Sequence, residues 1–275
     1  KEYEDYRELN LYNGVLAQQH PESGAAAYYL PLHAGSKKIW STEKRSFWCC
    51  CGSVIQAGSS HSIGIYAENE KQIAVNQFIP SVLTSNKWNR KIMISQKLGM
   101  AEKNVQKLIH SDTGSTVYPE VFPIQLSIDS VKAEKMTILV RVPAWNQKMP
   151  VVVINGEKIN CQIENGYLFI PCGGQKLEVT IFFYQALTVY EMDGCNKMIA
   201  FRQGPIVLAG ITGRDVLHGN RKHPYEILKH SNERVWGSWR MEYRTELEDE
   251  NFSFKPLYEV TDENYTVYFI NEEKD

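Results

Sequence analysis

Most of the chain alternates short apolar segments with polar turns, which is the pattern of a β protein. Beyond residue 62 the apolar runs recur at close spacing, and clusters of Gly, Asn, Pro or charged residues separate them. The predicted strands cover residues 63–67, 73–79, 91–98, 122–128, 136–142, 151–154, 167–170 and 177–183. Strands at this spacing predict a mainly β fold built as an antiparallel β-sandwich.

Turn residues support this interpretation and separate a further, smaller β unit. Asn155-Gly156 and Asn165-Gly166 are typical of two-residue hairpin turns. An apolar strand at residues 200–208, interrupted by Gly204-Pro205, opens the last part of the chain. Residues 218–250 are polar and weakly patterned, and apolar runs return at 252–260 and 265–270. We therefore expect a β-sandwich at residues 63–190 and a smaller β domain at 191–275.

The first residues follow a helical rather than a strand period. Tyr3, Tyr6, Leu9, Tyr12 and Leu16 recur at spacings of three and four, which predicts an amphipathic helix that ends between residues 14 and 18. A lone helix cannot bury its apolar face by itself, so this segment is typical of the tail of a helical domain lying upstream. Residues 21–60 are loop-like, and long loops tend to line a site. Residues 1–62 are thus expected to form one region.

Charge and hydrophobicity exclude several classes of function. The chain has thirty basic and thirty-two acidic residues, so its net charge of -2 favours neither nucleic acid nor an anionic membrane as a partner. No stretch approaches the roughly 20 apolar residues that span a bilayer. The chain begins Lys1-Glu2-Tyr3, and no signal peptide is visible in it.

Three consecutive cysteines, Cys49, Cys50 and Cys51, form the most unusual stretch of the sequence. Thiolates are strong nucleophiles and soft metal ligands. On an extended segment Cys49 and Cys51 would share a face and Cys50 would point away, unless Gly52 allows a turn. The alternative is that these cysteines are buried small hydrophobic residues, since free cysteine is among the most buried residue types.

Other residues that could carry chemistry are less specific. Single loop histidines could bind a metal or act as acid or base, but most are solvated; they are His20, His33 and His61. Aromatic residues of the same region could form a platform for a sugar, or could simply be buried; they are Tyr28, Tyr29, Trp40 and Trp48. No pair of carboxylates is marked by its spacing, and Asp5 and Glu43 are equally unspecific.

Ordered motifs along the whole chain resemble one family. They are the segment 3–16, Tyr29-Leu30-Pro31-Leu32, Ser46-Phe47-Trp48-Cys49-Cys50, the segment 75–81, Val140-Arg141-Val142-Pro143-Ala144-Trp145, Ile154-Asn155-Gly156, the segment 204–209 and Pro256-Leu257-Tyr258. Together they are similar to the C-terminal part of β-L-arabinofuranosidase-type glycoside hydrolases, families 127 and 146, formerly a domain of unknown function. The resemblance implies a remnant of an (α/α)6 barrel followed by β-sandwich domains.

The same resemblance implies a zinc-dependent cysteine mechanism. Cys49 corresponds to the nucleophile and, with Cys50, to a zinc ligand; zinc is the implied cofactor. The family's acid/base Glu and its Glu-x-Cys ligand pair are expected upstream of this chain, so Cys51 or a loop histidine would have to complete the metal site here. Residues 53–57 also lack the Glu-Asn pair that the family carries after its cysteine pair.

We therefore expect a fragment of a retaining glycoside hydrolase that cleaves β-L-arabinofuranosides in plant-type glycans and is inactive by itself. Its partner would be an arabinose-containing glycan, and a homodimer formed through the β domains is possible. A periplasmic or extracellular location is favoured over a cytoplasmic one. The alternative is a non-catalytic β-sandwich module that binds carbohydrate or a protein partner, with structural cysteines.

Overall fold

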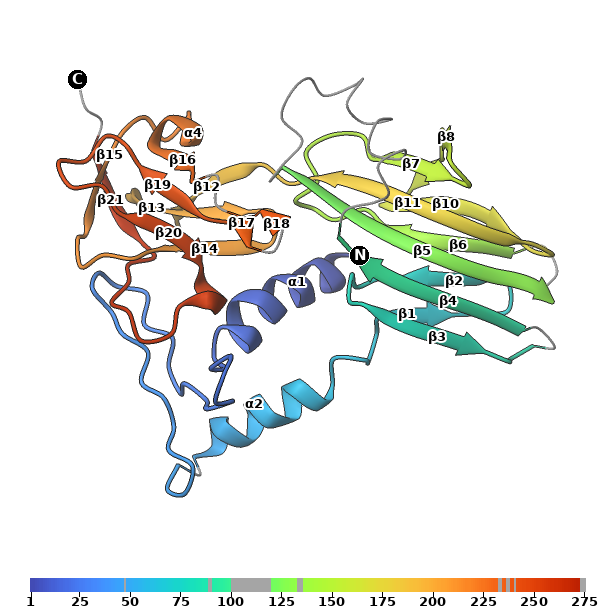
Figure 1. Ribbon diagram of the computed structural model, residues 1–275, viewed down its shortest axis with the longest axis horizontal. Helices are drawn as coiled ribbons and strands as arrows, with labels where there is room; N and C mark the ends of the chain where they lie inside the picture. Colours follow the sequence, from blue (N-terminus) through green and yellow to red (C-terminus); the bar gives the residue numbers. More distant parts are fainter. Residues whose placement is uncertain are drawn as a thin grey trace. The chain divides into compact units, whose positions relative to one another are not determined.

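The computed structural model describes residues 1–46, 48–88, 91–99, 120–132, 136–231, 234–235, 238–239 and 241–272. These residues form a mainly β protein, as the sequence predicts (Figure 1). The chain divides into two compact units. The first unit contains residues 1–6 and 61–185, and the second contains residues 7–60 and 186–275.

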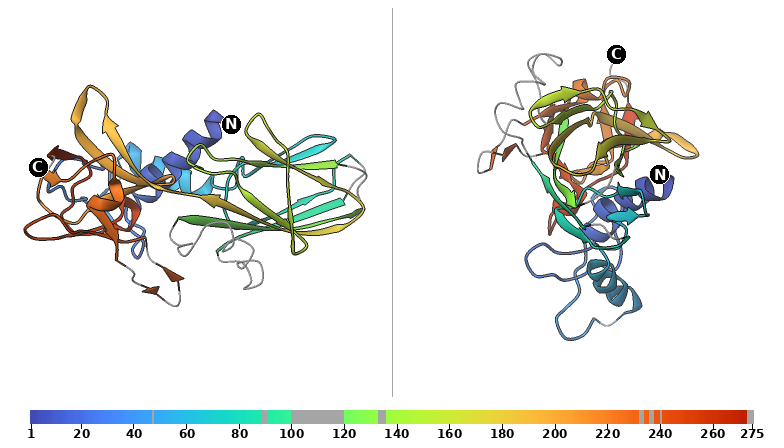
Figure 2. Two further views of the ribbon diagram at one scale, coloured as in Figure 1. Left: turned by 90° about the horizontal axis from the view of Figure 1, so that it is seen from above. Right: turned by 90° about the vertical axis from the view of Figure 1, so that its right-hand side faces the viewer.

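Two sheets make up the first unit (Figure 1, Figure 2). The five-stranded sheet has the order β1-β2-β6-β10-β9, and the six-stranded sheet has the order β3-β4-β5-β11-β7-β8. Neighbouring strands are antiparallel except for β2 and β6, which are parallel. The bounds are β1 (Tyr66–Glu68), β2 (Gln72–Val75), β3 (Ser81–Ser85), β4 (Lys91–Leu98), β5 (Val121–Lys132), β6 (Met136–Arg141), β7 (Val151–Ile154), β8 (Glu157–Ile159), β9 (Ile163–Glu164), β10 (Tyr167–Cys172) and β11 (Lys176–Tyr184).

Period-two alternation along the strands builds the core of the first unit. In β4, Ile92 and Ile94 are buried, while the alternating residues Lys91 and Met93 are exposed. One apolar cluster collects buried residues from both sheets, including Ile138 on the five-stranded sheet. Burying a side chain of this size contributes about 1.5–3 kcal/mol, so this cluster is the main source of the unit's stability.

Two predicted hairpin turns are present in the first unit. Asn155-Gly156 joins β7 to β8, and Asn165-Gly166 joins β9 to β10. All four residues have positive φ, with 51° at Asn155 and 52° at Asn165. Asn and Gly tolerate this backbone conformation at both turn positions, which explains why the sequence signal was reliable.

A buried cation holds the first residues of the chain to this unit. Arg141 is fully buried, and its Nε donates a hydrogen bond to the Asn76 carbonyl oxygen at 2.6 Å. Its guanidinium also forms an ion pair with the Asp5 carboxylate, which accepts a further hydrogen bond from the Ala144 N–H at 3.1 Å. Asp5 therefore satisfies a buried charge that would otherwise be costly.

The second unit contains an eight-stranded sheet of order β15-β21-β13-β14-β20-β19-β16, with β12 paired to β13, and a two-stranded sheet of β17 and β18. The parallel pair is β15 with β21. The bounds are β12 (Leu187–Met192), β13 (Cys195–Gln203), β14 (Ile206–Gly210), β15 (Val216–His218), α4 (Pro224–Ile227), β16 (Leu228–His230), β17 (Arg234–Val235), β18 (Ser238–Trp239), β19 (Tyr243–Thr245), β20 (Ser253–Pro256) and β21 (Phe269–Glu272). Residues 216–245 thus carry strands that the sequence pattern did not predict.

Phenylalanines form the centre of this second sheet. Phe254 lies 5.7 Å from Phe201 and 5.4 Å from Phe269 between ring centroids. Gly210 makes room for them, because a Cβ atom there would lie 2.7 Å from the Phe269 ring. A side chain at position 210 would therefore force these rings apart.

The predicted N-terminal helix is present as α1 (Glu2–Asn10), continued by a π-helical segment, η1 (Leu11–Leu16). Tyr3 and Tyr6 at the start of its apolar stripe are exposed, whereas Leu9, Tyr12 and Leu16 farther along the stripe are partly buried. Glu8 is instead the buried residue of α1. Within the ranges that the structure describes, no helix combines the length and the apolar character needed to cross a membrane.

Candidate active site

The three consecutive cysteines begin a helix. The segment α2 (Cys49–Ser59) starts directly after Trp48, whose backbone is extended (Figure 1). The cysteines therefore lie on a helix and not in the loop-like segment predicted for residues 21–60, and the extended arrangement considered for them does not occur. The first residues of a helix have N–H groups without helical partners, and the helix dipole favours negative charge there. This position suits thiolates.

Helical geometry gives the three thiols different surroundings. Cys49 is exposed, Cys50 is partly buried and Cys51 is buried. Successive residues of a helix point about 100° apart, so one cysteine anchors the helix while another faces outward. The interpretation as buried hydrophobic residues holds for Cys51 and fails for Cys49. Of the single cysteines, Cys172 lies in the core and Cys195 is exposed.

A tyrosine that lies distant in sequence contacts the exposed thiol. The Tyr28 hydroxyl lies 3.7 Å from the Cys49 Sγ, and the Cys50 Sγ lies 3.8 Å from the same sulfur. Hydrogen bonding from Tyr28, followed by that from Cys50, lowers the pKa of the Cys49 thiol. In return the two thiols, Cys50 foremost, raise the pKa of Tyr28, so its hydroxyl stays protonated and can donate. No pattern in the sequence indicates this contact.

A pocket of about 960 Å³ opens beside these thiols. Cys49, Trp40, Trp48 and Glu43 are among the residues that line it. The Trp40 indole is fixed because its N–H donates to the Thr261 carbonyl oxygen at 3.2 Å. The exposed thiol therefore faces a cavity with aromatic walls, which is the setting of a ligand site.

The three loop histidines lie in different places. His20 lines the thiol pocket, but its Nδ1 accepts backbone N–H groups of Glu22 and Ser23 at 3.2 and 3.3 Å. His33 lines a neighbouring pocket, and His61 belongs to the first unit. Over the described ranges, no group of three or more His, Cys, Asp or Glu side chains could hold a metal ion. Neither Cys51 nor a histidine is thus brought in as a third ligand.

The spacing of the Cys49 and Cys50 sulfurs is that of an ordinary sulfur–sulfur contact and is also compatible with two ligands of one zinc ion. Zn–S bonds of about 2.3 Å in tetrahedral geometry place two sulfurs about 3.8 Å apart. The Cys49 and Cys50 sulfurs have this separation, so the pair fits as two ligands of a zinc ion. The chemistry of thiolates at a helix N-terminus agrees with that fit.

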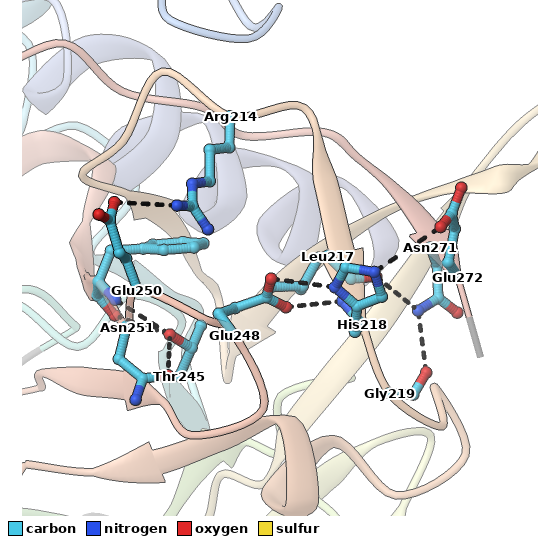
Figure 3. A network of polar contacts seen from close by, with 11 residues as sticks. Arg214, Leu217, His218, Gly219, Thr245, Glu248, Glu250, Asn251, Asn271 and Glu272 are labelled. Carbon is cyan, nitrogen blue, oxygen red and sulfur yellow. Dashed lines mark hydrogen bonds and ion pairs between the residues drawn. The ribbon is translucent and has the colours of Figure 1, made fainter. Parts of the chain in front are cut away.

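Another polar cluster in the second unit lies around His218. Its Nδ1 is 3.0 Å from the buried Glu248 carboxylate, which also accepts the His218 backbone N–H at 2.8 Å. Figure 3 shows Glu248 and Glu272 on opposite sides of the ring, and the Glu272 carboxylate lies 3.7 Å from Nε2. The cluster connects β15, β21 and the loop around residue 248. We interpret it as a structural connection.

Family comparisons agree with the sequence motifs. The GH127 catalytic-domain model of β-L-arabinofuranosidases matches residues 1–62, and the GH127 middle-domain model matches residues 72–180. No curated protein sequence matches the chain.

Solved structures share the fold over 98% of this chain. A GH127 β-L-arabinofuranosidase from Geobacillus stearothermophilus T6 is 18% identical with a TM-score of 0.70, and the match covers 46% of that protein. A protein described as a glycoside hydrolase is 16% identical with a TM-score of 0.72, over 98% of this chain and 48% of its own. A GH127 β-arabinofuranosidase is 18% identical with a TM-score of 0.71, and the match covers 98% of this chain and 46% of that protein.

The chain spans about half the length of these solved proteins. Their low identity means that they establish the fold and not the activity. The two GH127 models together match more than half of the residues, in agreement with the motifs around Cys49 and Arg141. The chain therefore belongs to the GH127 family of β-L-arabinofuranosidase-like glycoside hydrolases.

Proposed function

We propose that this chain forms part of a retaining glycoside hydrolase that cleaves β-L-arabinofuranosides in plant-type glycans, with Cys49 as the nucleophile. One observation carries the proposal: the Cys49 thiol is exposed at a helix N-terminus, lines a pocket of about 960 Å³ and contacts the Tyr28 hydroxyl. The family match makes a furanoside the first substrate to test.

The proposed reaction proceeds in two displacements. The Cys49 thiolate attacks the anomeric carbon, a C–S bond forms, and the bond to the leaving oxygen breaks as that oxygen takes up a proton. Water then attacks the same carbon and gives a proton to a base, the C–S bond breaks so that the Cys49 thiolate leaves, and the sugar is released with its original configuration. In both steps the Tyr28 hydroxyl donates a hydrogen bond to the Cys49 sulfur while that sulfur carries negative charge.

Cys49 and Cys50 would hold zinc in this site. Bound zinc would supply positive charge that keeps both thiols ionised near neutral pH. A structural zinc site takes four ligands, and the described residues place these two together. The proposal therefore requires further ligands beyond those that the structure describes around Cys49.

We also infer that the isolated chain does not turn over substrate. Retaining glycosidases need a proton donor beside the nucleophile, and general acid catalysis contributes about 10²–10⁴-fold. Among the described residues, no carboxylate hydrogen-bonds the Cys49 thiol, and Glu43 is the one carboxylate that lines its pocket. Release of arabinose by this chain alone would contradict the expectation.

The finer architecture belongs to the same proposal. The shared apolar cluster of the two sheets in the first unit supports a β-sandwich. The exposed start of the apolar stripe of α1 supports its origin in a helical barrel. Both features fit the family model matches at residues 1–62 and 72–180.

Equilibrium dialysis with zinc tests the site directly. We expect zinc binding to be lost in Cys49→Ser and in Cys50→Ser, and to persist in Cys161→Ser and Cys195→Ser as matched controls. The competing possibility is a non-catalytic module. If glycan binding and zinc binding were both unchanged in Cys49→Ser and in Cys50→Ser, the results would support that module and overturn the proposed nucleophile.

A further inference from the structure

A second pocket lies next to the thiol pocket in the second unit. Its volume is about 800 Å³, and its walls include Tyr28, Tyr29, His33, Lys37 and Trp48. Trp48 lines both pockets and directly precedes Cys49 in the chain. A ligand that reaches the Cys49 thiol can therefore extend past Trp48 into this second pocket, which we call the aromatic pocket.

The aromatic pocket exposes large rings that packing does not require. The exposed fraction is 75% for Tyr29 and 53% for Trp48. Tyr28 holds both rings in place, with ring centroids 4.6 Å from Tyr29 and 5.9 Å from Trp48 in edge-on geometry. Exposed apolar side chains gathered around a hollow mark a binding site. Flat rings of this kind pack against the apolar C–H face of a sugar ring.

The charges of the two pockets differ. Lys37 and His33 are both exposed in the aromatic pocket, and none of the described residues that line it is an Asp or Glu. The thiol pocket has the opposite character, since Glu43 lines it and no Lys or Arg is among its described lining residues. A cationic, aromatic cavity favours a ligand that combines a sugar face with a carboxylate.

We propose that the aromatic pocket binds an acidic sugar unit, of the uronic acid class, on the leaving-group side of the furanoside that Cys49 attacks. The Lys37 ammonium and the His33 ring N–H face its carboxylate, and Tyr29 and Trp48 pack against its ring. This inference rests on the proposed function for its position relative to the nucleophile. It narrows the substrate to arabinofuranosides attached to acidic glycans.

The test uses the digalacturonate dianion and its methyl ester as probes, because the ester keeps the ring and hydroxyls and removes the charge. Titration of the chain is followed by NMR shifts of the Trp48 indole and His33 ring signals. We expect the acid to bind about threefold to fivefold more tightly than the ester, which is the upper range for a single exposed ion pair. Salt should weaken only the acid. Equal affinities, or no shift of either signal, overturn the proposal.

Matched variants locate the site. Lys37→Gln should lower the affinity for the acid about threefold to fivefold and leave the affinity for the ester unchanged. Lys44 is a nearby exposed loop lysine that lines neither pocket, so Lys44→Gln should change neither affinity. An equal loss in Lys44→Gln would mean a nonspecific charge effect and would overturn the site. Loss of ester binding in Tyr29→Ala supports the aromatic contact, and unchanged ester binding contradicts it.

Cys49→Ser separates this inference from the proposed function. That variant should bind the acid as tightly as the parent chain, because the thiol does not face the aromatic pocket. Failure of zinc binding with intact acid binding would count against the nucleophile alone. Intact zinc binding without preference for the acid would count against the aromatic pocket alone.

Discussion

The core of the first unit and the pockets of the second unit use large apolar side chains in opposite ways. Ile138, Ile181 and Phe183 are fully buried in the first unit. Tyr29 and Ile39 beside the aromatic pocket are 75% and 81% exposed. Each exposed side chain forgoes about 1.5–3 kcal/mol of burial energy. The buried side chains therefore stabilise the fold, whereas the exposed ones are available for ligand contact.

Truncation in the core should give the largest effect. Phe183→Ala should lower the free energy of unfolding by about 3–5 kcal/mol, because it leaves a cavity between packed rings. Tyr29→Ala is the matched control and should change it by less than about 0.5 kcal/mol. Urea denaturation measures both. Comparable losses in the two variants would remove the distinction between the regions.

The second-largest loss of stability is expected from removing Asp5, the ion-pair partner of the buried Arg141. Asp5→Ala should lower the free energy of unfolding by about 3 kcal/mol, since Arg141 then keeps a buried charge without its carboxylate. Glu2→Ala, an exposed acidic residue of the same helix, serves as the control. A denaturation midpoint that is unchanged in Asp5→Ala would show that Arg141 does not depend on this ion pair.

A buried lysine gives the second unit its own pH dependence. Lys38 Nζ donates to the Leu257 and Val260 carbonyl oxygens at 2.8 and 2.7 Å, and burial lowers its pKa to about 8 from 10.5. Between these pH values the unfolded chain binds more protons, so stability should rise with pH, by roughly 1–2 kcal/mol from pH 8 to 10. Thermal unfolding over this range should show the rise in the parent chain and lose it in Lys38→Met. An identical pH slope in both would contradict this assignment.

The smallest effect concerns the thiol. Tyr28→Phe removes the hydrogen bond that chiefly lowers the pKa of Cys49, so the midpoint of its alkylation by iodoacetamide should move to higher pH. Mass spectrometry follows Cys49 and the exposed Cys195 in the same sample. The Cys195 profile should be unaffected. A parallel shift at both cysteines would mean that Tyr28 does not act on Cys49.

Strands with one buried face were predicted well. The bounds of β4 and β7 agree with the prediction because alternation or a continuous apolar run directly records burial. The strand β3 was not predicted, since only Ser85 in it is buried and the segment lacks an apolar pattern. Strands β16 to β19 lie in the polar stretch and are only two or three residues long, which is too short for an alternating pattern to indicate a strand.

The candidate site was predicted by residue type and not by geometry. The sequence identified Cys49 and Cys50, but the segment predicted as loop-like is a helix at these residues. The run Cys-Cys-Cys-Gly-Ser has no period that distinguishes strand from helix, so tertiary packing around the buried Cys51 decides the conformation. The role of Tyr28 depends on that helix, because a contact across twenty-one residues of loop leaves no local signal.

Local patterns and ordered motifs were sufficient to predict the β architecture, the hairpin turns, the family and the residue types of the reactive segment. The exposed sulfur, the tyrosine that contacts it, and the basic and aromatic residues beside it became evident from the folded chain alone. The reason is that the pattern of apolar and polar residues reflects which side chains of an element are buried. Partners and cavities arise from long-range packing, which depends on the whole chain at once.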